Sequence, residues 1–168
     1  MVPVRKAVRV LLVNERQELL LMKVEFNNLK KVDGTPSPSR YWITLGGKIE
    51  NGENIQDAAI REIYEEAGIT SVTIGPVVWF ETFHLSYNDV LSKYDNTYIV
   101  MKTKEHDISD THWTDGEKNY VKDIRWFSLN DLEKEKRDIH PVNPTLAQQY
   151  FPEIFKGNYP EVPLYFDV

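Results

Sequence analysis

The sequence predicts an α/β fold: a mixed sheet with helices on its faces, in one domain that spans residues 1–168. Short β-branched and apolar segments recur along the chain, one amphipathic helix lies among them, and another helix follows the last of these segments. Hydrophobic residues make up 41% of the 168 residues and charged residues 27%, which excludes disordered and fibrous classes. A chain of this length is enough for one well-packed domain, whereas two would be small.

The first predicted elements form a hairpin. Residues 7–14 (AVRVLLVN) and 18–24 are typical of strands, and the polar residues 15–17 between them would make the turn. Further strands are expected at 41–45, 72–74, 77–85, 97–103 and 124–127, and polar loops at 26–40, 86–96 and 104–122. Ser128 is a suitable N-cap for a short helix over residues 129–136.

The last segment, residues 140–168, is rich in both proline and aromatic residues. Its five prolines limit it to one short helix, near residues 146–150. They are Pro141, Pro144, Pro152, Pro160 and Pro163. Because Phe, Tyr and Leu are frequent in this segment, we expect it to pack on the domain.

Charge and cysteine content limit the function. The chain has no cysteine, which excludes disulfides, thiolate zinc sites and cysteine nucleophiles. Its formal net charge of −6 argues against a nucleic-acid binder and leaves cations as partners for the surplus carboxylates. The longest apolar run, Val8 to Val13, is interrupted by Arg9 and is too short to span a membrane, and no signal peptide is predicted. These features predict a cytoplasmic protein.

An amphipathic helix is predicted over residues 54–67. Asn54 is a good N-cap, and Gly68 is a natural residue to end the helix. Ile60, Ile63 and Ala67 would form the apolar stripe that packs on the sheet.

Three carboxylates gather on another side of this helix. At about 100° of rotation per residue, Glu62, Glu65 and Glu66 fall within an arc of about 100°, beside Ala58 and Ala59. Like charges at these spacings destabilise a helix by about 0.2–0.5 kcal/mol per pair. A solvated acidic face is the ordinary interpretation of such a pattern. The alanines favour a different interpretation, a cation site, because small side chains let a second backbone approach the carboxylates. A divalent cation bound there would remove the repulsion between them.

The residues before the helix would supply that backbone. Gly46-Gly47 permits a tight bend, and a turn at Asn51-Gly52 would fold the loop back over the carboxylates. A loop carbonyl with two or three carboxylates is a suitable set of oxygen ligands for Mg²⁺, which shares its coordination with substrate phosphates.

Residues 47–69, GKIENGENIQDAAIREIYEEAGI, match a known motif at every fixed position. The motif is the Nudix box: Gly, five residues, Glu, seven residues, then Arg-Glu-aliphatic-any-Glu-Glu-any-Gly-aliphatic. Seven fixed residues give a chance match on the order of 10⁻⁸ per register. The chain therefore resembles the Nudix hydrolases (MutT-like), from about Arg5 to Glu133. The resemblance implies an α/β/α sandwich with a loop–helix–loop motif, and Mg²⁺- or Mn²⁺-dependent hydrolysis of a nucleoside diphosphate linked to another moiety.

The resemblance also implies roles for individual residues. The metal ligands would be the Gly47 carbonyl and the carboxylates of Glu62, Glu65 and Glu66. Glu62 and Arg61 would take part in catalysis, and Arg61 would pair with Glu53 to hold the loop against the helix. Leu45 departs from the family pattern, because many members have proline before the glycine pair; the change concerns loop rigidity rather than catalysis.

The resemblance leaves the general base open. It is either a glutamate of the box, such as Glu62, or an acid on a later loop. Glu117 stands in the segment TDGEKNYVKDIRW, where many relatives have a functional glutamate, and Asp115 and Asp123 compete with it. An exposed loop acid is an equally good interpretation of Glu117.

Two further residues are candidates for substrate binding. Trp42 precedes the catalytic loop and would stack on a base, and Lys48 would meet a phosphate. The ordinary interpretations are burial in the core for one of Tyr41 and Trp42, and solvation for Lys48.

Three functions fit these features. The first is hydrolysis of a nucleotide-type diphosphate, such as a (d)NTP or ADP-ribose. The second is a Nudix-fold sensor that binds such a ligand without cutting it, although relatives of that kind usually lack carboxylates of the box. The third is a diphosphate isomerase of the same fold, which tends to carry a cysteine that this chain lacks. The hydrolase is therefore favoured, with a small nucleotide as substrate; a homodimer is compatible with the sequence.

Overall fold

The computed structural model describes residues 1–139 and 144–167, with the side chains of 144–148 left out. Its strands are β1 (Val4–Val13), β2 (Leu19–Glu25), β3 (Leu29–Lys30), β4 (Arg40–Lys48), β5 (Thr73–Tyr87), β6 (Val90–Lys102), β7 (Val121–Phe127) and β8 (Leu164–Asp167). Its helices are α1 (Ile55–Ala67), α2 (Asp115–Tyr120), α3 (Leu129–Glu135) and α4 (Pro144–Lys156), and a 3-10 turn, η1 (Lys136–Asp138), follows α3.

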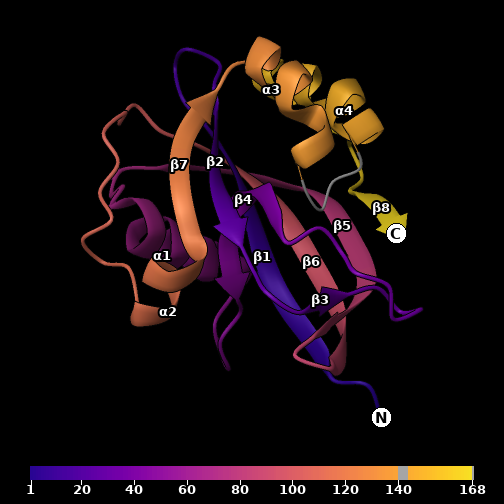
Figure 1. Cartoon of the computed structure of the whole chain (residues 1–168). Helices are drawn as coiled ribbons and strands as arrows, with labels where there is room; N and C mark the ends of the chain where they lie inside the picture. The colour runs from indigo at the N-terminus through magenta and orange to yellow at the C-terminus, as the bar shows by residue number, and fades with distance from the viewer. Residues whose placement is uncertain (140–143, 168) are drawn as a thin grey trace.

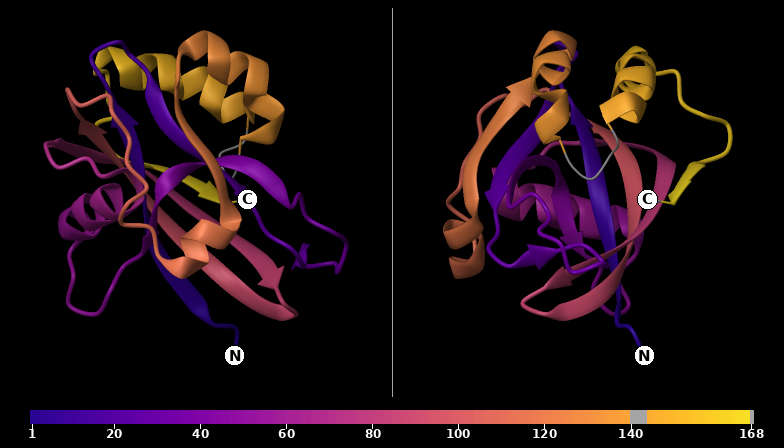
Figure 2. Two further views of the ribbon diagram at one scale, coloured as in Figure 1. Left: turned by 60° about the vertical axis from the view of Figure 1, so that its left-hand side comes forward. Right: turned by 45° about the vertical axis from the view of Figure 1, so that its right-hand side comes forward.

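The strands form a mixed sheet in the order β3-β5-β6-β1-β4-β2-β7, and β8 lies beside β5 (Figure 1). β1 runs parallel to β6 along its whole length and antiparallel to β4. The sheet is strongly twisted and curled, and helices cover it from different sides (Figure 2). The predicted fold class, an α/β sandwich with a mixed sheet, is confirmed.

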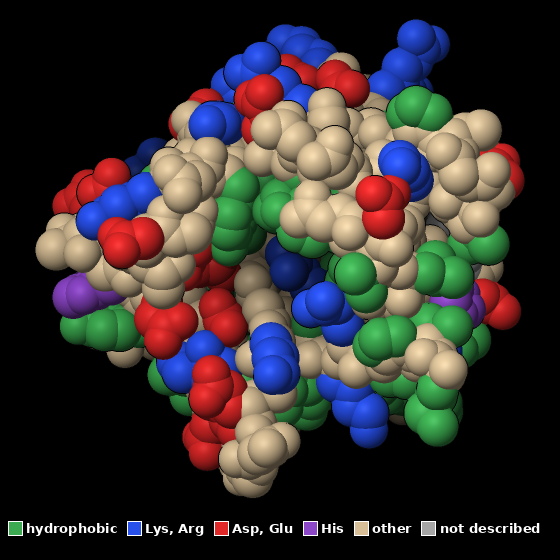
Figure 3. All heavy atoms as spheres, turned by 60° about the horizontal axis from the view of Figure 1, so that its bottom comes forward, with side chains coloured by type: hydrophobic (Ala, Val, Ile, Leu, Met, Phe, Trp, Pro, Cys, Tyr) green, Lys and Arg blue, Asp and Glu red, His purple; other side chains and the backbone are tan. Residues whose placement is uncertain are grey.

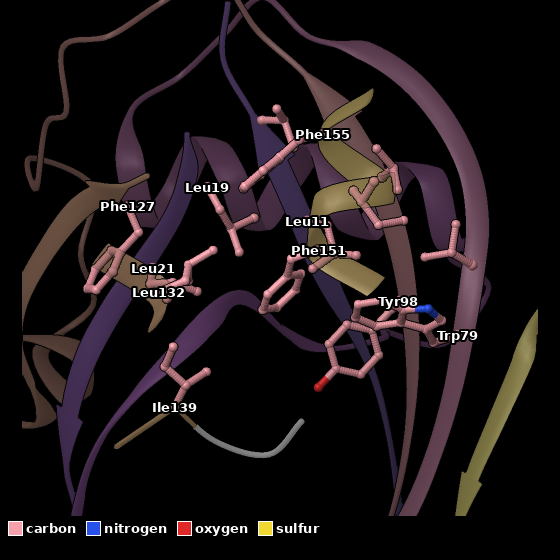
Figure 4. Packing of buried hydrophobic residues seen from close by; sticks show 14 of the residues in the cluster. Leu11, Leu19, Leu21, Trp79, Tyr98, Phe127, Leu132, Ile139, Phe151 and Phe155 are labelled. Atoms are coloured by element: carbon pink, nitrogen blue, oxygen red, sulfur yellow. The ribbon is translucent and has the colours of Figure 1, made fainter. Parts of the chain in front are cut away.

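Side chains alternate across β1 and divide the core into two main clusters. Val8, Val10 and Leu12 point to the side covered by α1. Leu11 and Val13 point to the opposite side, where α3 and α4 pack (Figure 4). Because successive residues of a strand face opposite sides, an uninterrupted apolar run is what a strand covered on both faces requires.

The tail packs on the sheet. Phe151, Ile154 and Phe155 of α4 are buried in the same cluster as Leu11, and β8 adds a parallel strand beside β5. The predicted short helix near 146–150 is wrong in extent, because α4 continues through Pro152 to Lys156. Each buried aromatic side chain contributes about 1.5–3 kcal/mol, which offsets the roughly 3 kcal/mol that a proline costs inside a helix. Pro141 lies outside the described residues.

The segment from residue 72 to residue 103 contains more regular structure than predicted. The strands expected at 72–74 and 77–85 are one long strand, β5, whose register with β6 is irregular around Gly75 and Pro76. The loop expected at 86–96 is only a tight turn at Asn88 and Asp89, both with positive φ, so that β5 and β6 form a long hairpin. Cross-strand pairing allows polar residues to extend a hairpin, which an apolar pattern does not reveal.

The remaining loops also hold short elements. β3 interrupts the loop expected at 26–40, and α2 interrupts the loop expected at 104–122. Thr114 caps α2 by accepting a hydrogen bond from the backbone N–H of Glu117, so Glu117 lies on a helix rather than on a loop. None of the helices in the described ranges is long and apolar enough to cross a membrane.

Candidate active site

The helix that carries the acidic residues begins and ends as its capping residues predict. The Asn54 side chain accepts a hydrogen bond of 2.8 Å from the backbone N–H of Asp57. Gly68 ends the helix in the left-handed conformation, with φ 69°, and donates its N–H to the carbonyl of Tyr64. Both ends of α1 are thus determined locally.

The side of α1 that packs on the sheet differs from the prediction. Ala58, Ala59, Ile63 and Ala67 are fully buried, whereas Ile60 is 38% exposed. The expected stripe of Ile60, Ile63 and Ala67 is therefore wrong at Ile60. Packing the alanines on the sheet rotates the helix so that the side of the carboxylates also turns inward.

Glu62 and Glu66 are buried against the Gly46–Gly47 loop. The backbone N–H of Gly46 donates a hydrogen bond of 2.7 Å to Glu66 Oε1. A Cβ atom on Gly47 would lie 2.5 Å from Glu62 Oε1, closer than carbon and oxygen atoms approach. The glycine pair and the helix therefore meet as predicted, but Gly46 and Gly47 belong to strand β4, which continues past the predicted end at residue 45. Glycine at 47 leaves room for a carboxylate.

Arg61 holds the loop to the helix. Its Nε and Nη2 atoms each donate a hydrogen bond of 2.8 Å to the two carboxylate oxygens of Glu53, and Nη2 also donates to the carbonyl of Lys48. Nη1 lies 2.9 Å from Glu62 Oε1 and 3.4 Å from Glu65 Oε2. The hydrogen bonds from Arg61 lower the pKa of Glu53 to about 2. The expected pair of Arg61 and Glu53 is present.

Burial perturbs the two inner carboxylates. It raises the pKa of Glu66 well above its usual value, and the negative charges of Glu62 and Glu117 raise it further, against the positive charge of Arg9. Burial also raises the pKa of Glu62, an effect that Arg61 opposes. Both carboxylates would gain from a cation, because a cation stabilises the ionised form.

Glu117 joins this group from α2. It is buried, and its Oε1 accepts a hydrogen bond of 3.0 Å from the Thr114 hydroxyl. Its Oε2 is buried without a hydrogen-bond partner among the described residues. The competing acids Asp115 and Asp123 are exposed. An exposed loop acid, the ordinary interpretation of Glu117, is thus wrong.

The metal ligands do not converge in this arrangement. In the ranges 1–139 and 144–167, no three Asp, Glu or His side chains come together in a way that would hold an ion. Arg61 draws Glu62 and Glu65 toward itself, and the Glu65 side chain remains 35% exposed. Joint coordination by the predicted carboxylates therefore requires these two side chains to turn away from Arg61.

An open cavity of about 660 Å³ lies beside Gly47. Its aromatic lining comes from Phe26, Tyr41, Phe83, Tyr87 and Tyr94, and its basic lining from Arg5, Lys6, Arg9 and Lys48. On the face shown in Figure 3 the surface is hollowed, with basic side chains around and inside the hollow and acidic side chains gathered next to it. This combination suits a ligand with a flat ring and negative charge.

Comparison with known proteins decides the family. The family model for the NUDIX domain matches residues 3–149. This chain belongs to the Nudix hydrolase family. The predicted family is thereby confirmed, and the chain spans about half the length of the curated relatives that it matches.

Individual relatives are distant from this Nudix chain. It is 31% identical, over 62% of its length, to an isopentenyl-diphosphate Δ-isomerase of Aliivibrio fischeri (strain MJ11), of which the match covers 54%. It is similar to the crystal structure of a MutT protein from Methanosarcina mazei Go1, with TM-score 0.62, 20% identity and coverage of 94% and 96% of the two chains. Escherichia coli dihydroneopterin triphosphate pyrophosphohydrolase gives TM-score 0.60 and 17% identity, with coverage of 91% and 99%. These structures share the fold.

The two predicted substrate-binding residues of this Nudix chain lie in different places. Trp42 is 2% exposed, and its ring packs edge-on against Phe127, with 4.7 Å between ring centroids. It belongs to the core and does not line the cavity, so the prediction for Trp42 is wrong; its neighbour Tyr41 lines the cavity instead. Lys48 is exposed and lines the cavity.

The sequence interpretation missed two residues of this Nudix site. Arg9 is buried beneath the cavity and bonds to Thr44, and its charge lowers the pKa of both Glu62 and Glu66. Tyr120 stacks on Phe26 of the cavity wall, with 4.8 Å between ring centroids; burial raises its pKa, and the charge of Glu66 raises it further. An arginine within an apolar strand was a detectable signal for Arg9; nothing comparable marks Tyr120.

Proposed function

We propose that this chain hydrolyses a pyrophosphate bond in a nucleoside diphosphate linked to another moiety, such as a (d)NTP or ADP-ribose. The observation that carries the proposal is the burial of Glu62 and Glu66 against Gly46 and Gly47, since Gly47 itself lines an aromatic and basic cavity. Buried acids with raised pKa values are costly to keep ionised, and such groups cluster at functional sites. A phosphorylated ligand in the cavity would place its phosphates beside them.

The donor set fits Mg²⁺ or Mn²⁺, which prefer oxygen ligands. The carboxylate of Glu62 lies against the backbone of Gly47, in the space that a Cβ would fill, and Glu66 accepts a hydrogen bond from the neighbouring Gly46 N–H. The Gly47 carbonyl and Glu62, Glu65 and Glu66 would hold the ion. When bound, the ion neutralises phosphate charge and lowers the pKa of water.

The chain's own residues would position the substrate. Lys48 lies at the cavity edge next to Gly47, where it would pair with a phosphate oxygen. Arg61 fixes the loop that carries both residues through the Lys48 carbonyl, so its contribution to catalysis is to position Gly47 and Glu62.

Glu117 is our candidate for the general base. Its Oε2 has no hydrogen-bond partner in the described part of the chain. The charge of Glu117 raises the pKa of Glu66, so Glu117 is near the box carboxylates. A carboxylate held in this way would accept the proton of the attacking water. Glu62 is the alternative, because it is nearest to Gly47.

The other candidate functions have less support. Loss of hydrolysis with retained binding would fit a sensor, but this chain has every carboxylate of the box. One relative is named as an isomerase of a diphosphate, and it is matched over only part of its length. The chain has no cysteine, which that class tends to use.

A hydrolysis screen tests the proposal. Purified protein would be given Mg²⁺ or Mn²⁺ with nucleoside triphosphates, ADP-ribose, dinucleoside polyphosphates and capped RNA, and the nucleotide products would be separated and measured by chromatography. We expect turnover of at least one nucleotide, abolished by excess EDTA, because the ligands must bind a metal to act. Full turnover in EDTA would contradict the metal requirement, and no turnover of any substrate would contradict the proposed activity.

A further inference from the structure

Arg9 lies at the floor of the cavity and is only 8% exposed. Its Nε donates a hydrogen bond of 3.2 Å to Thr44 Oγ1, and its Nη2 donates to the Thr44 carbonyl. Both partners are neutral, and no ion pair of Arg9 occurs among the described residues. Glu62, Glu66 and Glu81 interact electrostatically with Arg9 but accept no hydrogen bond from it among the described residues, so its unused N–H donors are left for an acceptor on a ligand.

One donor of Arg9 remains for such a ligand. Its Nη1 has no hydrogen-bond partner in the described ranges, yet it is not sealed in the interior as Oε2 of Glu117 is. Arg9 lines the cavity, and Nη1 is the nitrogen of its guanidinium that Thr44 leaves for a ligand there. The floor of the cavity thus offers a charged hydrogen-bond donor.

Asn96 offers an acceptor next to this donor. It is 6% exposed and lines the cavity, and its Nδ2 donates a hydrogen bond of 3.0 Å to Oε1 of the buried Glu81. The carboxylate also accepts from the Tyr98 hydroxyl, at 3.4 Å. Because Nδ2 is bonded to Glu81, Oδ1 is the amide atom left for a ligand in the cavity. An ionised carboxylate only accepts hydrogen bonds, and the pKa of Glu81 is raised to about 7, so Glu81 fixes this orientation above that pH.

The two groups are neighbours on the sheet. β1 and β6 run side by side, with Ala7 opposite Asn96 and Arg9 opposite Tyr98. Residues two apart in a strand share a face, so Arg9 and Asn96 project to the same side of adjacent strands. Aromatic rings of the same cavity stand beside them, including Phe83 and Tyr94, which stack on each other with 5.0 Å between centroids.

We propose that Arg9 and Asn96 select the base of the nucleotide by an edge that carries a carbonyl oxygen next to a ring N–H. Arg9 Nη1 donates to the carbonyl, Asn96 Oδ1 accepts from the N–H, and Glu81 is a positioning residue that keeps Asn96 in this orientation. Inosine, guanosine and uridine have such an edge. Adenosine and cytidine have the reverse pattern, with an amino donor facing Arg9 and a ring-nitrogen acceptor facing Asn96.

The inference rests on the proposed function for its choice of a nucleotide, but its test does not require turnover. Calorimetric titration without metal would compare IMP with AMP, and UMP with CMP, because each pair differs only in this edge. We expect the wild-type protein to bind IMP and UMP at least tenfold more tightly, since mispaired buried polar groups are strongly disfavoured. Equal binding within each pair, or binding of none of the four, would overturn the inference.

Variants assign the preference to residues. Arg9→Met should reduce the preference for IMP over AMP by roughly 10- to 100-fold, the range expected when a charged donor is lost. Glu81→Gln should reduce it less, because Gln both donates and accepts and so releases the orientation of Asn96. Arg5→Met is the matched control: Arg5 lines the same cavity but is exposed, so its loss should affect IMP and AMP alike.

Other outcomes separate the alternatives. If Arg9→Met weakens IMP and AMP equally, Arg9 binds the phosphate and the inference is wrong. If Arg9→Met does not fold, Arg9→Lys retains the charge but cannot bond both Thr44 and a ligand, and its preference should fall in the same way. Preferential IMP binding without hydrolysis of any nucleotide would overturn the proposed function alone, whereas hydrolysis with equal binding would overturn this inference alone.

Discussion

The molecule buries charge in two neighbouring regions, and it does so differently. In the box, Glu62 and Glu66 come from one helix turn and face a loop about 20 residues earlier in the chain. At the cavity floor, Arg9 and Asn96 come from different strands, and each is held by a side chain of a neighbouring strand, Thr44 and Glu81 respectively. The box has more carboxylates than it has cations to match them, whereas the floor has an arginine with only neutral hydrogen-bond partners. The first arrangement suits a metal and the second suits a neutral polar ligand group.

The largest effect on the box region is expected from a substitution of Glu66. Glu66→Gln should lower kcat by at least about a hundredfold, because a metal ligand is lost, while the protein stays folded. Removing a buried charge should leave the free energy of unfolding unchanged or higher, since the new amide still accepts from Gly46 N–H. Steady-state kinetics and denaturant unfolding check both parts. An unfolded variant, or one with kcat near wild type, would contradict the assignment.

Substitution of Glu117 tests whether α2 contributes a catalytic residue to the box region. If Glu117 is the base, Glu117→Gln should lower kcat by about 10²-fold, at the low end of the 10²–10⁴-fold range for general bases. Asp115→Asn and Asp123→Asn are the controls, because both residues are exposed and should remain close to wild type. A change within about threefold for Glu117→Gln would place the base in the box, with Glu62 as the first candidate.

Gly47 tests how closely the loop and the helix must approach. Gly47→Ala should lower kcat/KM by roughly tenfold, because the new Cβ would lie 2.5 Å from Glu62 Oε1 and force that carboxylate to move. Only the end of a flexible side chain must shift, so the midpoint of thermal unfolding should change little. Gly116→Ala is the control, because its Cβ would meet nothing closer than 3.8 Å. Equal kinetics for the two variants would show that the approach is not needed for catalysis.

The smallest catalytic effect is expected from substitution of Glu81. Its effect is measured instead as the free energy of unfolding at different pH values. Burial raises the pKa of Glu81 to about 7. A raised pKa in the folded state means that the stability linked to this group is fully present below its ordinary pKa and is lost as the pH rises through about 7. Glu81→Gln should therefore gain stability relative to wild type between pH 5 and pH 8, by about 1–3 kcal/mol. A difference that does not vary with pH would contradict this.

The box could be predicted from the sequence because its parts are local. The helix from Asn54 to Gly68, its caps and the glycine loop all lie within about 25 residues, where hydrogen bonds and spacing determine the structure. Even here the sequence pattern misplaced Ile60, because which side of a helix packs depends on the sheet beneath it. Trp42 and Tyr41 show the same limit: alternation predicts that they point to opposite sides, but not which of the two lines the cavity.

The sequence by itself determined the family, the order of most strands, the helix that carries the carboxylates and the loop that approaches it. Only the tertiary structure decided what surrounds them. Glu117 is buried beside the box because α2 folds onto it, and Arg9 lies under an aromatic cavity because β1 pairs with both β4 and β6. Such placements depend on pairing between strands that are distant in the chain. A linear pattern records which residues a strand contains, but not which strands become its neighbours.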